Sequence, residues 1–272
     1  MAEINLQELE QFIETDIIQP FYCSRLNSLQ NQKLNKLLKT KNPYLFIAKN
    51  TNIAADYVKQ MLDAFLSSSE ETIFGGSLEK LAIFVNQKIY NGYKPPEGEF
   101  PSIDLIFDKD EFTYIVGVKS GGYWGNADSI RQMITNITLH HKSNIKLISG
   151  ICYGTSGVNK CEVKDKNKKG IDIFYYKYVG KDFWSLISGI DEFYTDIIEP
   201  LGKAIKGKDI AFKAEYDKKL NELTHGLLND YCHNNEIDWE KIVQFNSKPR
   251  QLRQPRQPRH TNASRKARSK TS

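Results

Sequence analysis

The sequence lacks the features that mark secreted, disulfide-rich and membrane proteins. Its 272 residues include only four cysteines, far apart and without a Cys-x-x-Cys pair, which argues against a disulfide scaffold and a zinc ribbon. No apolar run approaches the ~20 residues needed to cross a bilayer. The first twenty residues are acidic and amphipathic, without the basic start and small-residue cleavage site of a signal peptide. We therefore expect a soluble, cytoplasmic protein with no membrane partner.

Acidic residues are absent from the end of the chain. From Lys248 to Ser272 the sequence carries lysines, arginines and prolines but no Asp or Glu, whereas the body before it is mildly acidic. Such a segment cannot bury enough apolar surface to fold alone. It is either a tether that binds nucleic-acid phosphates or a solvated, dispensable extension.

The spacing of apolar residues divides the body into helical and strand-forming parts. Helical spacing dominates the first ~90 residues, with breaks expected at Pro20 and Pro43 and a bend near Gly75 and Gly76. Short runs rich in β-branched and aromatic residues then predict two strand pairs, separated and followed by helices. This order predicts an α/β fold in which helices flank a mixed sheet.

The same pattern sets the expected domain organisation. We expect a single domain over residues 1–245 and a basic, disordered tail over residues 246–272. Within the domain, the predicted parts are a helical N-terminal part (about 1–90), a sheet core (about 91–180) and C-terminal helices (about 181–245).

Two charged residues stand out in the first predicted strand pair. The runs PSIDLIF and FTYIVGVKS, joined by DKDE, are typical of a hairpin. Asp104 lies in the first run and Lys119 near the end of the second, and both are costly to bury unless paired or bound to a metal. Because paired strands lie ~4.8 Å apart, the two side chains could share one site. A plain cross-strand ion pair is the alternative.

This arrangement resembles the PD-(D/E)xK nuclease superfamily. The resemblance implies that Asp104 holds a divalent metal and that Lys119 assists the attacking water. The superfamily's second acid, two residues before the lysine, is replaced here by Gly117, and its proline is displaced to Pro101. Glu79, from the preceding helical run, is the best substitute acid; Glu70 and Glu71 are second choices. With the carbonyl of Val118, two carboxylates would supply the hard oxygen ligands that suit Mg²⁺.

Longer strings carry a more specific resemblance, from about Phe21 to Gly202. They are similar to a family of type II restriction endonucleases whose described members cut GGNCC-type sites. The strings are FYCSRLNSLQNQKLNKLLKTKNPYLFIAKN, LDAFLSSSEETIFGGSLEKLAIFV, VGVKSGGYWGNADSIRQM and KDFWSLISGIDEFYTDIIEPLG. A small residue commonly precedes the Val/Ile-Lys pair in this family, as Gly117 does here.

The resemblance implies a restriction-endonuclease-like fold and Mg²⁺-dependent hydrolysis of double-stranded DNA that leaves 5′-phosphates. A pseudo-palindromic site implies a homodimer with one active site per strand, and a separate DNA methyltransferase would protect the host genome. The candidate DNA contacts are Ser120, Trp124, Asn126, Arg131, Gln132 and Lys164. The alternatives are a buried core position for Trp124, a solvated helix face for Arg131 and Gln132, and a mobile, solvated loop for Lys164.

Two other functional classes stay open from the sequence. One is a structure-directed repair or recombination nuclease, which would use the same chemistry but read DNA shape. The other is a non-enzymatic DNA-binding protein in which the basic tail binds and Asp104 and Lys119 are only structural. Neither a helix nor a loop in the sequence marks itself as the element that reads bases.

Overall fold

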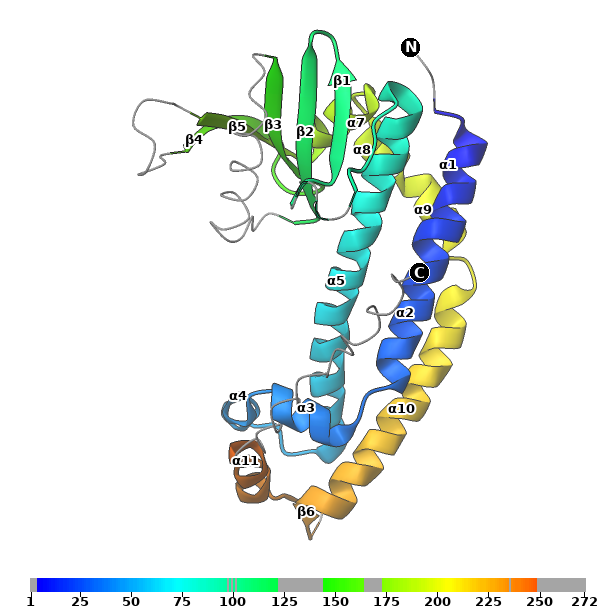
Figure 1. Ribbon diagram of the computed structural model, residues 1–272. Coiled ribbons are helices and arrows are strands. Elements are labelled where there is room, and N and C mark those ends of the chain that lie inside the picture. The colour runs from blue at the N-terminus through cyan, green and yellow to red at the C-terminus, as the bar shows by residue number, and fades with distance from the viewer. Residues whose placement is uncertain are drawn as a thin grey trace, which may run out of the picture.

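The molecule is elongated, with a β-sheet at one end and a long bundle of helices leading away from it (Figure 1). The computed structural model describes residues 4–96, 98, 100, 102–121, 144–163, 173–234 and 236–248. Two large hydrophobic cores lie along its length in the described residues, one under the sheet and one among the helices of the far end, and a small third cluster lies on the first three strands of the sheet. None of the described helices combines the length and the apolar character needed to span a bilayer.

The first helical rod contains α1 (Leu6–Phe12), the π-helical segment η1 (Ile13–Ile18) and α2 (Gln19–Gln30). The break predicted at Pro20 is wrong. Proline lacks an N–H and its ring crowds the preceding turn, but here a wider π turn comes just before it. Gln19 donates its N–H to the carbonyl of Glu14, five residues back. The helix therefore passes through the proline instead of stopping.

The break predicted at Pro43 is confirmed, because α3 (Leu34–Thr40) ends before it and α4 (Pro43–Ala48) begins with it. Proline suits the first position of a helix, where its missing N–H costs nothing. The second core lies here. Side chains of α2, α3 and α4 pack there against α5, α10 (Lys208–Tyr231) and α11 (Trp239–Ser247).

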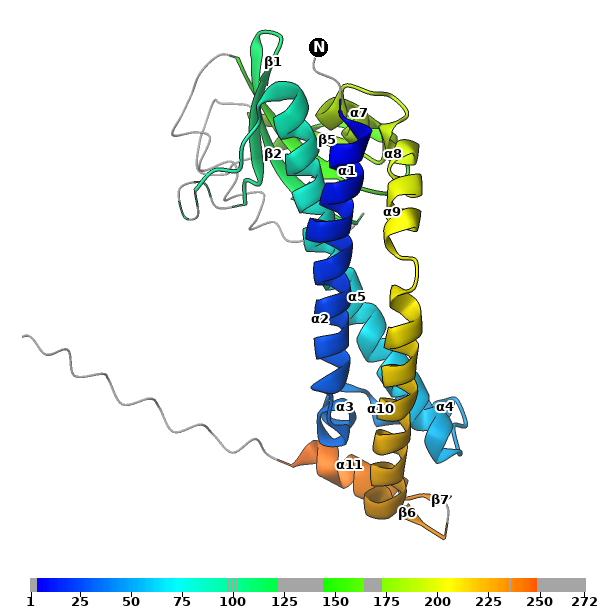
Figure 2. The same cartoon turned by 90° about the vertical axis from the view of Figure 1, so that its right-hand side faces the viewer.

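Helix α5 (Ala54–Tyr90) runs for 37 residues and links the two ends of the molecule (Figure 2). The bend predicted at Gly75 and Gly76 is wrong, since the helix is continuous there. Its first half packs in the far core through Met61 and Leu62, and its second half packs under the sheet through Leu81 and Val85. At 1.5 Å per residue, a helix of this length spans about 55 Å. One rigid element thus connects both cores.

The sheet is mixed and has the strand order β1-β2-β3-β5-β4. Strands β2, β3 and β5 are parallel, and β1 and β4 pair antiparallel at the two edges. The strands are β1 (Leu105–Lys109), β2 (Phe112–Lys119), β3 (Ile145–Ile151), β4 (Gly157–Val163) and β5 (Ile173–Val179). This architecture confirms the predicted α/β fold with a mixed sheet flanked by helices.

Helices cover one face of the sheet. The second half of α5 contacts β1 and β2, and α7 (Lys181–Ser188) contacts β4 and β5. Two short helices, α8 (Phe193–Asp196) and α9 (Ile198–Ala204), then lead the chain back along α1 and η1 towards α10 (Figure 2). A small hairpin of β6 (Cys232–His233) and β7 (Glu236–Ile237) separates α10 from α11.

Two local predictions need correction. The charged segment expected to be a loop between the second pair of strands begins inside β4, so Lys160 and Glu162 lie on a strand. The turn of the first hairpin is also shorter than DKDE, because β1 extends to Lys109 and only Asp110 and Glu111 connect the strands. Asp110 has a φ of 55°, a left-handed conformation that aspartate tolerates in tight turns. The helix expected over about 127–143 and the tail beyond Lys248 lie outside the described residues.

Candidate functional site

The hairpin of β1 and β2 positions Asp104. The residue directly precedes β1, and its backbone N–H donates to the carbonyl of Val116 at 2.9 Å. Its carboxylate oxygen Oδ2 accepts a hydrogen bond from the backbone N–H of Val118 at 2.7 Å. Strand β1 begins one residue later, at Leu105. The carboxylate of Asp104 therefore accepts the N–H of Val118 at the point where the β1–β2 hydrogen bonding ends. The side chain is only 14% exposed, so it is fixed and largely desolvated.

Lys119 is the last residue of β2, at the carboxyl edge of the parallel strands. It pairs with Ile151 of β3, and its carbonyl accepts a hydrogen bond from the N–H of Cys152 at 2.8 Å. In α/β sheets this edge is where ligands bind. The ammonium Nζ lies 4.0 Å from Oδ2 of Asp104, and the side chain is 44% exposed. The lysine therefore sits beside the aspartate while its charged end still reaches solvent.

Glu79 approaches the same place from α5. Its carboxylate pairs with Nζ of Lys94 at 2.7 Å and is about a quarter exposed. The charge of Glu79 acts on Asp104: burial first, and then this neighbouring carboxylate, raise the pKa of Asp104 above its usual range. The N–H of Val118 and the ammonium groups of Lys119 and Lys94 oppose that rise. The structure thus brings the side chains of Asp104, Lys119 and Glu79 together in one cluster.

The donor chemistry of this cluster fits a hard divalent cation. Two neighbouring carboxylates repel each other and burial penalises their charges, so a cation between them would relieve both costs. Val118 contributes a carbonyl on the β1 side, because the N–H and C=O of one strand residue point to the same edge. Within the described ranges there is no group of three or more His, Cys, Asp or Glu side chains that could hold a metal. Mg²⁺ suits so small a set because it retains several waters.

Ser120 follows Lys119 and turns the chain towards α5. A Cβ added to Gly75 would lie 2.9 Å from Oγ of Ser120, so any larger residue would require the Ser120 side chain to shift. Next to this contact is a pocket of ≈ 260 Å³ lined by Phe21, Glu70, Glu71, Phe74, Gly75, Leu78, Ser120 and Tyr153. The pocket lies directly beside the carboxyl edge that carries Lys119.

Glu70 and Glu71, the second-choice acids, are placed differently from Glu79. Glu70 forms an ion pair with Arg25 of α2, so its charge is already compensated. Glu71 is exposed and lines the pocket. Of the three glutamates, only Glu79 is among the groups whose charge acts on Asp104. Glu79 is therefore the acid that the fold brings to the aspartate.

Three residues near the site were not found from the sequence. Cys152 follows β3; burial, and then the charges of Glu79 and Asp104, raise the pKa of its thiol to about 12, so it stays protonated and is a poor nucleophile. Trp184 of α7 donates its indole N–H to the carbonyl of Cys152 at 2.9 Å. Tyr153 is 56% exposed and lines the pocket. The parallel pairing of β2 with β3 brings Cys152 and Tyr153 next to Lys119. No local feature of the sequence indicates this pairing.

Of the predicted DNA contacts, only Ser120 lies in the part of the chain that the structure describes. The others, Trp124, Asn126, Arg131, Gln132 and Lys164, lie outside the described residues.

One family of known proteins matches most of the chain. The model of the family described as type II restriction endonuclease EcoO109I matches residues 7–209, which include the hairpin, the whole of α5 and the sheet. No curated protein is similar enough to match the chain. Because the family match extends over well more than half of the sequence, the chain belongs to the type II restriction endonuclease EcoO109I family, whose members are DNA-cleaving hydrolases.

Proposed function

We propose that this protein hydrolyses double-stranded DNA in a Mg²⁺-dependent, sequence-specific reaction at the cluster of Asp104, Glu79 and Lys119. The observation that carries the proposal is the convergence of these three side chains at the carboxyl edge of the sheet. Asp104 is buried next to another carboxylate, an arrangement that costs stability and is therefore typical of a functional site. The family match supports DNA as the substrate.

Each of these residues would have a role that follows from its position. Asp104 and Glu79, with the carbonyl of Val118, would hold the metal. When bound, Mg²⁺ would supply an acidified water and charge neutralisation at the phosphate. Lys119 would orient the attacking water and stabilise negative charge that develops on the phosphate oxygens. Its Nζ is 4.0 Å from Asp104, longer than a hydrogen bond, so the lysine is not committed to a tight ion pair.

The finer features follow from the resemblance of the sequence to this family. We propose cleavage at a GGNCC-like site, products with 5′-phosphate and 3′-hydroxyl ends, and a homodimer that places one active site on each strand. A separate methyltransferase would modify the same site. The contacts proposed for Ser120, Trp124, Asn126, Arg131, Gln132 and Lys164 belong to this part of the proposal.

A plasmid digestion tests the proposal. Wild-type protein with Mg²⁺ should give discrete fragments, and run-off sequencing should place every cut in one short sequence. EDTA should abolish cleavage, and Lys119→Ala should bind the same DNA but leave it intact. A smear or branch-dependent cutting would favour a structure-directed nuclease. Binding without any metal-dependent product would favour a non-enzymatic DNA-binding protein, and cleavage by Lys119→Ala would overturn the assigned site.

A further inference from the structure

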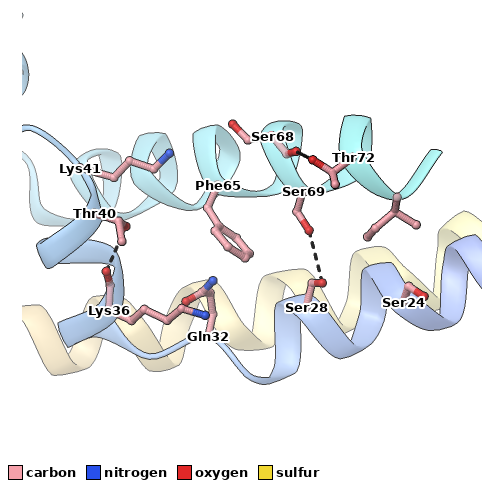
Figure 3. A pocket seen from close by; sticks show the side chains of 11 residues that line it. Ser24, Ser28, Gln32, Lys36, Thr40, Lys41, Phe65, Ser68, Ser69 and Thr72 are labelled. Atoms are coloured by element: carbon pink, nitrogen blue, oxygen red, sulfur yellow. Dashed lines mark hydrogen bonds between the residues drawn. The ribbon is translucent and has the colours of Figure 1, made fainter. Parts of the chain in front are cut away.

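A second, larger pocket lies away from the carboxylates, between α2, α3 and α5 (Figure 3). Its volume is ≈ 460 Å³. Nine of its eleven lining residues have polar side chains, although the surface that they present to the pocket is mostly apolar, and they come from the three helices and the turns after α2 and α3. They are Ser24, Ser28, Gln32, Lys36, Thr40, Lys41, Phe65, Ser68, Ser69, Thr72 and Ile73, and we call this the hydroxyl groove.

Gln32 is the unusual member of the hydroxyl groove. The residue is 1% exposed, yet neither its amide nitrogen nor its amide oxygen has a hydrogen-bond partner. Its side chain extends from the end of α2 towards Phe65 of α5, with Lys36 beside it (Figure 3). A buried polar group without a partner costs about 1–3 kcal/mol and is rare in native proteins. The two unsatisfied polar atoms of this amide therefore point to a polar ligand that would bind beside it.

The remaining groups define the charge of that ligand. Ser28 accepts a hydrogen bond from the hydroxyl of Ser69 at 3.3 Å, which leaves its own O–H as a donor. Elsewhere on the molecule, lysines such as Lys59 pair with carboxylates. The ammonium of Lys36 lies 5.8 Å from the centre of the Phe65 ring, and neither Lys36 nor Lys41 has a carboxylate partner among the described residues. Hydroxyl and amide donors beside two such ammonium groups are the chemistry that binds phosphate.

The hydroxyl groove lies on the same face of α5 as the site of cleavage. Ser68, Thr72, Gly75 and Glu79 follow one another at spacings of three and four residues, which places them in one row along the helix. Ser68 and Glu79 are eleven residues apart in the sequence, or about 16 Å along the axis. The smaller pocket, which includes Gly75 and Ser120, lies between them. A strand of DNA advances 3.4 Å per nucleotide, so this distance corresponds to about five base pairs.

We propose that the hydroxyl groove binds the phosphodiester backbone of the DNA duplex that flanks the cut site, about five to six base pairs from the scissile phosphate. The inference rests on the proposed function and adds a second anchoring point to it. Lys36 and Lys41 neutralise phosphates, and Ser28 and the amide of Gln32 donate hydrogen bonds to them. Glu71 is exposed between the two regions and repels phosphate, so the backbone contacts the groove on the side of the lysines.

Duplexes of two lengths test this inference. Binding of the full chain is measured in EDTA, which prevents cleavage, to a GGNCC duplex of about 24 base pairs and to one of about 9. The double variant Lys36→Ala/Lys41→Ala should bind the long duplex about tenfold more weakly than wild type and the short duplex equally well. Its salt dependence on the long duplex should be shallower by about 1.8 in log–log slope, for two lost phosphate contacts. Lys49→Ala/Lys59→Ala removes the same charge outside the groove and should match wild type.

Gln32→Leu separates ligand binding from a structural role. It removes a buried amide without partners, so the variant should unfold at an equal or higher denaturant concentration than wild type. Its affinity for the long duplex should nevertheless fall, and its affinity for the short duplex should not. A variant that is less stable and binds both duplexes normally would assign Gln32 to the fold alone and overturn the inference.

The other outcomes are also decisive. If Lys36→Ala/Lys41→Ala loses affinity equally for both duplexes, or loses none for the long duplex, the flanking contact is overturned. Inorganic phosphate is the second probe: if it displaces both duplexes from wild type but not from Lys36→Ala/Lys41→Ala, the groove is a site for free anions and the inference fails. If wild type neither binds nor cleaves either duplex, the proposed function itself has failed. Intact cleavage with unchanged long-duplex binding by the groove variants rejects only the groove.

Discussion

One oxygen of Asp104 both accepts the backbone N–H of Val118, at 2.7 Å, and faces Nζ of Lys119, at 4.0 Å. The two partners are consecutive residues of β2, so one strand end supplies a fixed amide and a mobile ammonium to the same carboxylate. The amide holds the carboxylate in place, because a backbone donor cannot rotate away. The lysine, half in solvent, keeps the freedom to meet a substrate.

The raised pKa of Asp104 predicts that this residue costs stability. Between its usual pKa of 3.8 and the raised value, the folded protein keeps a proton that the unfolded chain releases. Below pH 3.8 Asp104 is protonated in both states and carries no cost. The free energy of unfolding then falls as the pH rises from 3.8 through the folded-state pKa, and above that pKa the full cost of the buried charge is present. Asp104→Asn removes the charge and still accepts from Val118. Urea unfolding should show the variant to be more stable than wild type at neutral pH, with the difference vanishing at pH 3.

The same variant tests the link with the metal. Mg²⁺ should raise the unfolding midpoint of wild type and leave that of Asp104→Asn nearly unchanged, because a ligand stabilises only the protein that binds it. The cleavage rate of the variant should fall by roughly a thousandfold or more. Equal stabilisation of both proteins by Mg²⁺ would remove Asp104 from the set of ligands.

Glu79 and Glu71 offer a matched pair on one helix. Glu79→Gln removes the carboxylate that acts on Asp104 and should reduce cleavage by about a hundredfold or more, with a higher Mg²⁺ requirement. Glu71→Gln removes an exposed carboxylate two turns away that is not among the groups acting on Asp104, so its Mg²⁺ requirement should match that of wild type. Cleavage rates over a Mg²⁺ titration measure both effects. Identical titration curves for Glu79→Gln and wild type would contradict the assignment.

Gly75 and Gly76 form a second pair. Alanine at an exposed helix position is favoured over glycine by about 0.5–1 kcal/mol, and a Cβ at Gly76 meets nothing within 4 Å. Gly76→Ala should therefore be more stable than wild type and fully active. At Gly75 the Cβ would lie 2.9 Å from Oγ and 3.3 Å from Cβ of Ser120, so rotation of the hydroxyl alone gives no relief. Gly75→Ala should gain less stability and cleave several-fold more slowly; equal rates for both variants would show that Ser120 moves without consequence.

Trp184 should stabilise the site through its hydrogen bond to the carbonyl of Cys152. Trp184→Phe leaves the buried carbonyl of Cys152 without its indole donor and should lower the free energy of unfolding by about 1–3 kcal/mol. Because the N–H of Cys152 binds the carbonyl of Lys119, cleavage should fall as well. Trp239→Phe, in the far core, is the control: it should lose some stability and keep its activity. Urea titrations and initial cleavage rates measure the two effects, and an unchanged rate for Trp184→Phe would limit the tryptophan to the fold.

Local features of the sequence were sufficient for a good part of this result. The β-branched and aromatic residues of PSIDLIF and FTYIVGVKS indicate strands, and the short polar link indicates their pairing. Two costly charges then stand out as Asp104 and Lys119, because burial has to be compensated wherever it occurs. Pro43 begins a helix for an equally local reason, since its ring fixes the backbone at a position that needs no N–H.

Other features depend on contacts between distant residues, which no local pattern carries. Pro20 lies within a helical rod because a π turn and the packing of η1 under the sheet outweigh the helix-breaking tendency of proline. Gly75 and Gly76 form no bend because α5 is held in two cores at once. The parallel pairing of β2 with β3 brings Cys152 to Lys119, and the packing of α5 across the sheet brings Glu79 to Asp104. The sequence by itself thus determined which side chains are chemically costly, and the tertiary structure decided which of them meet, because only packing joins elements that are far apart along the chain.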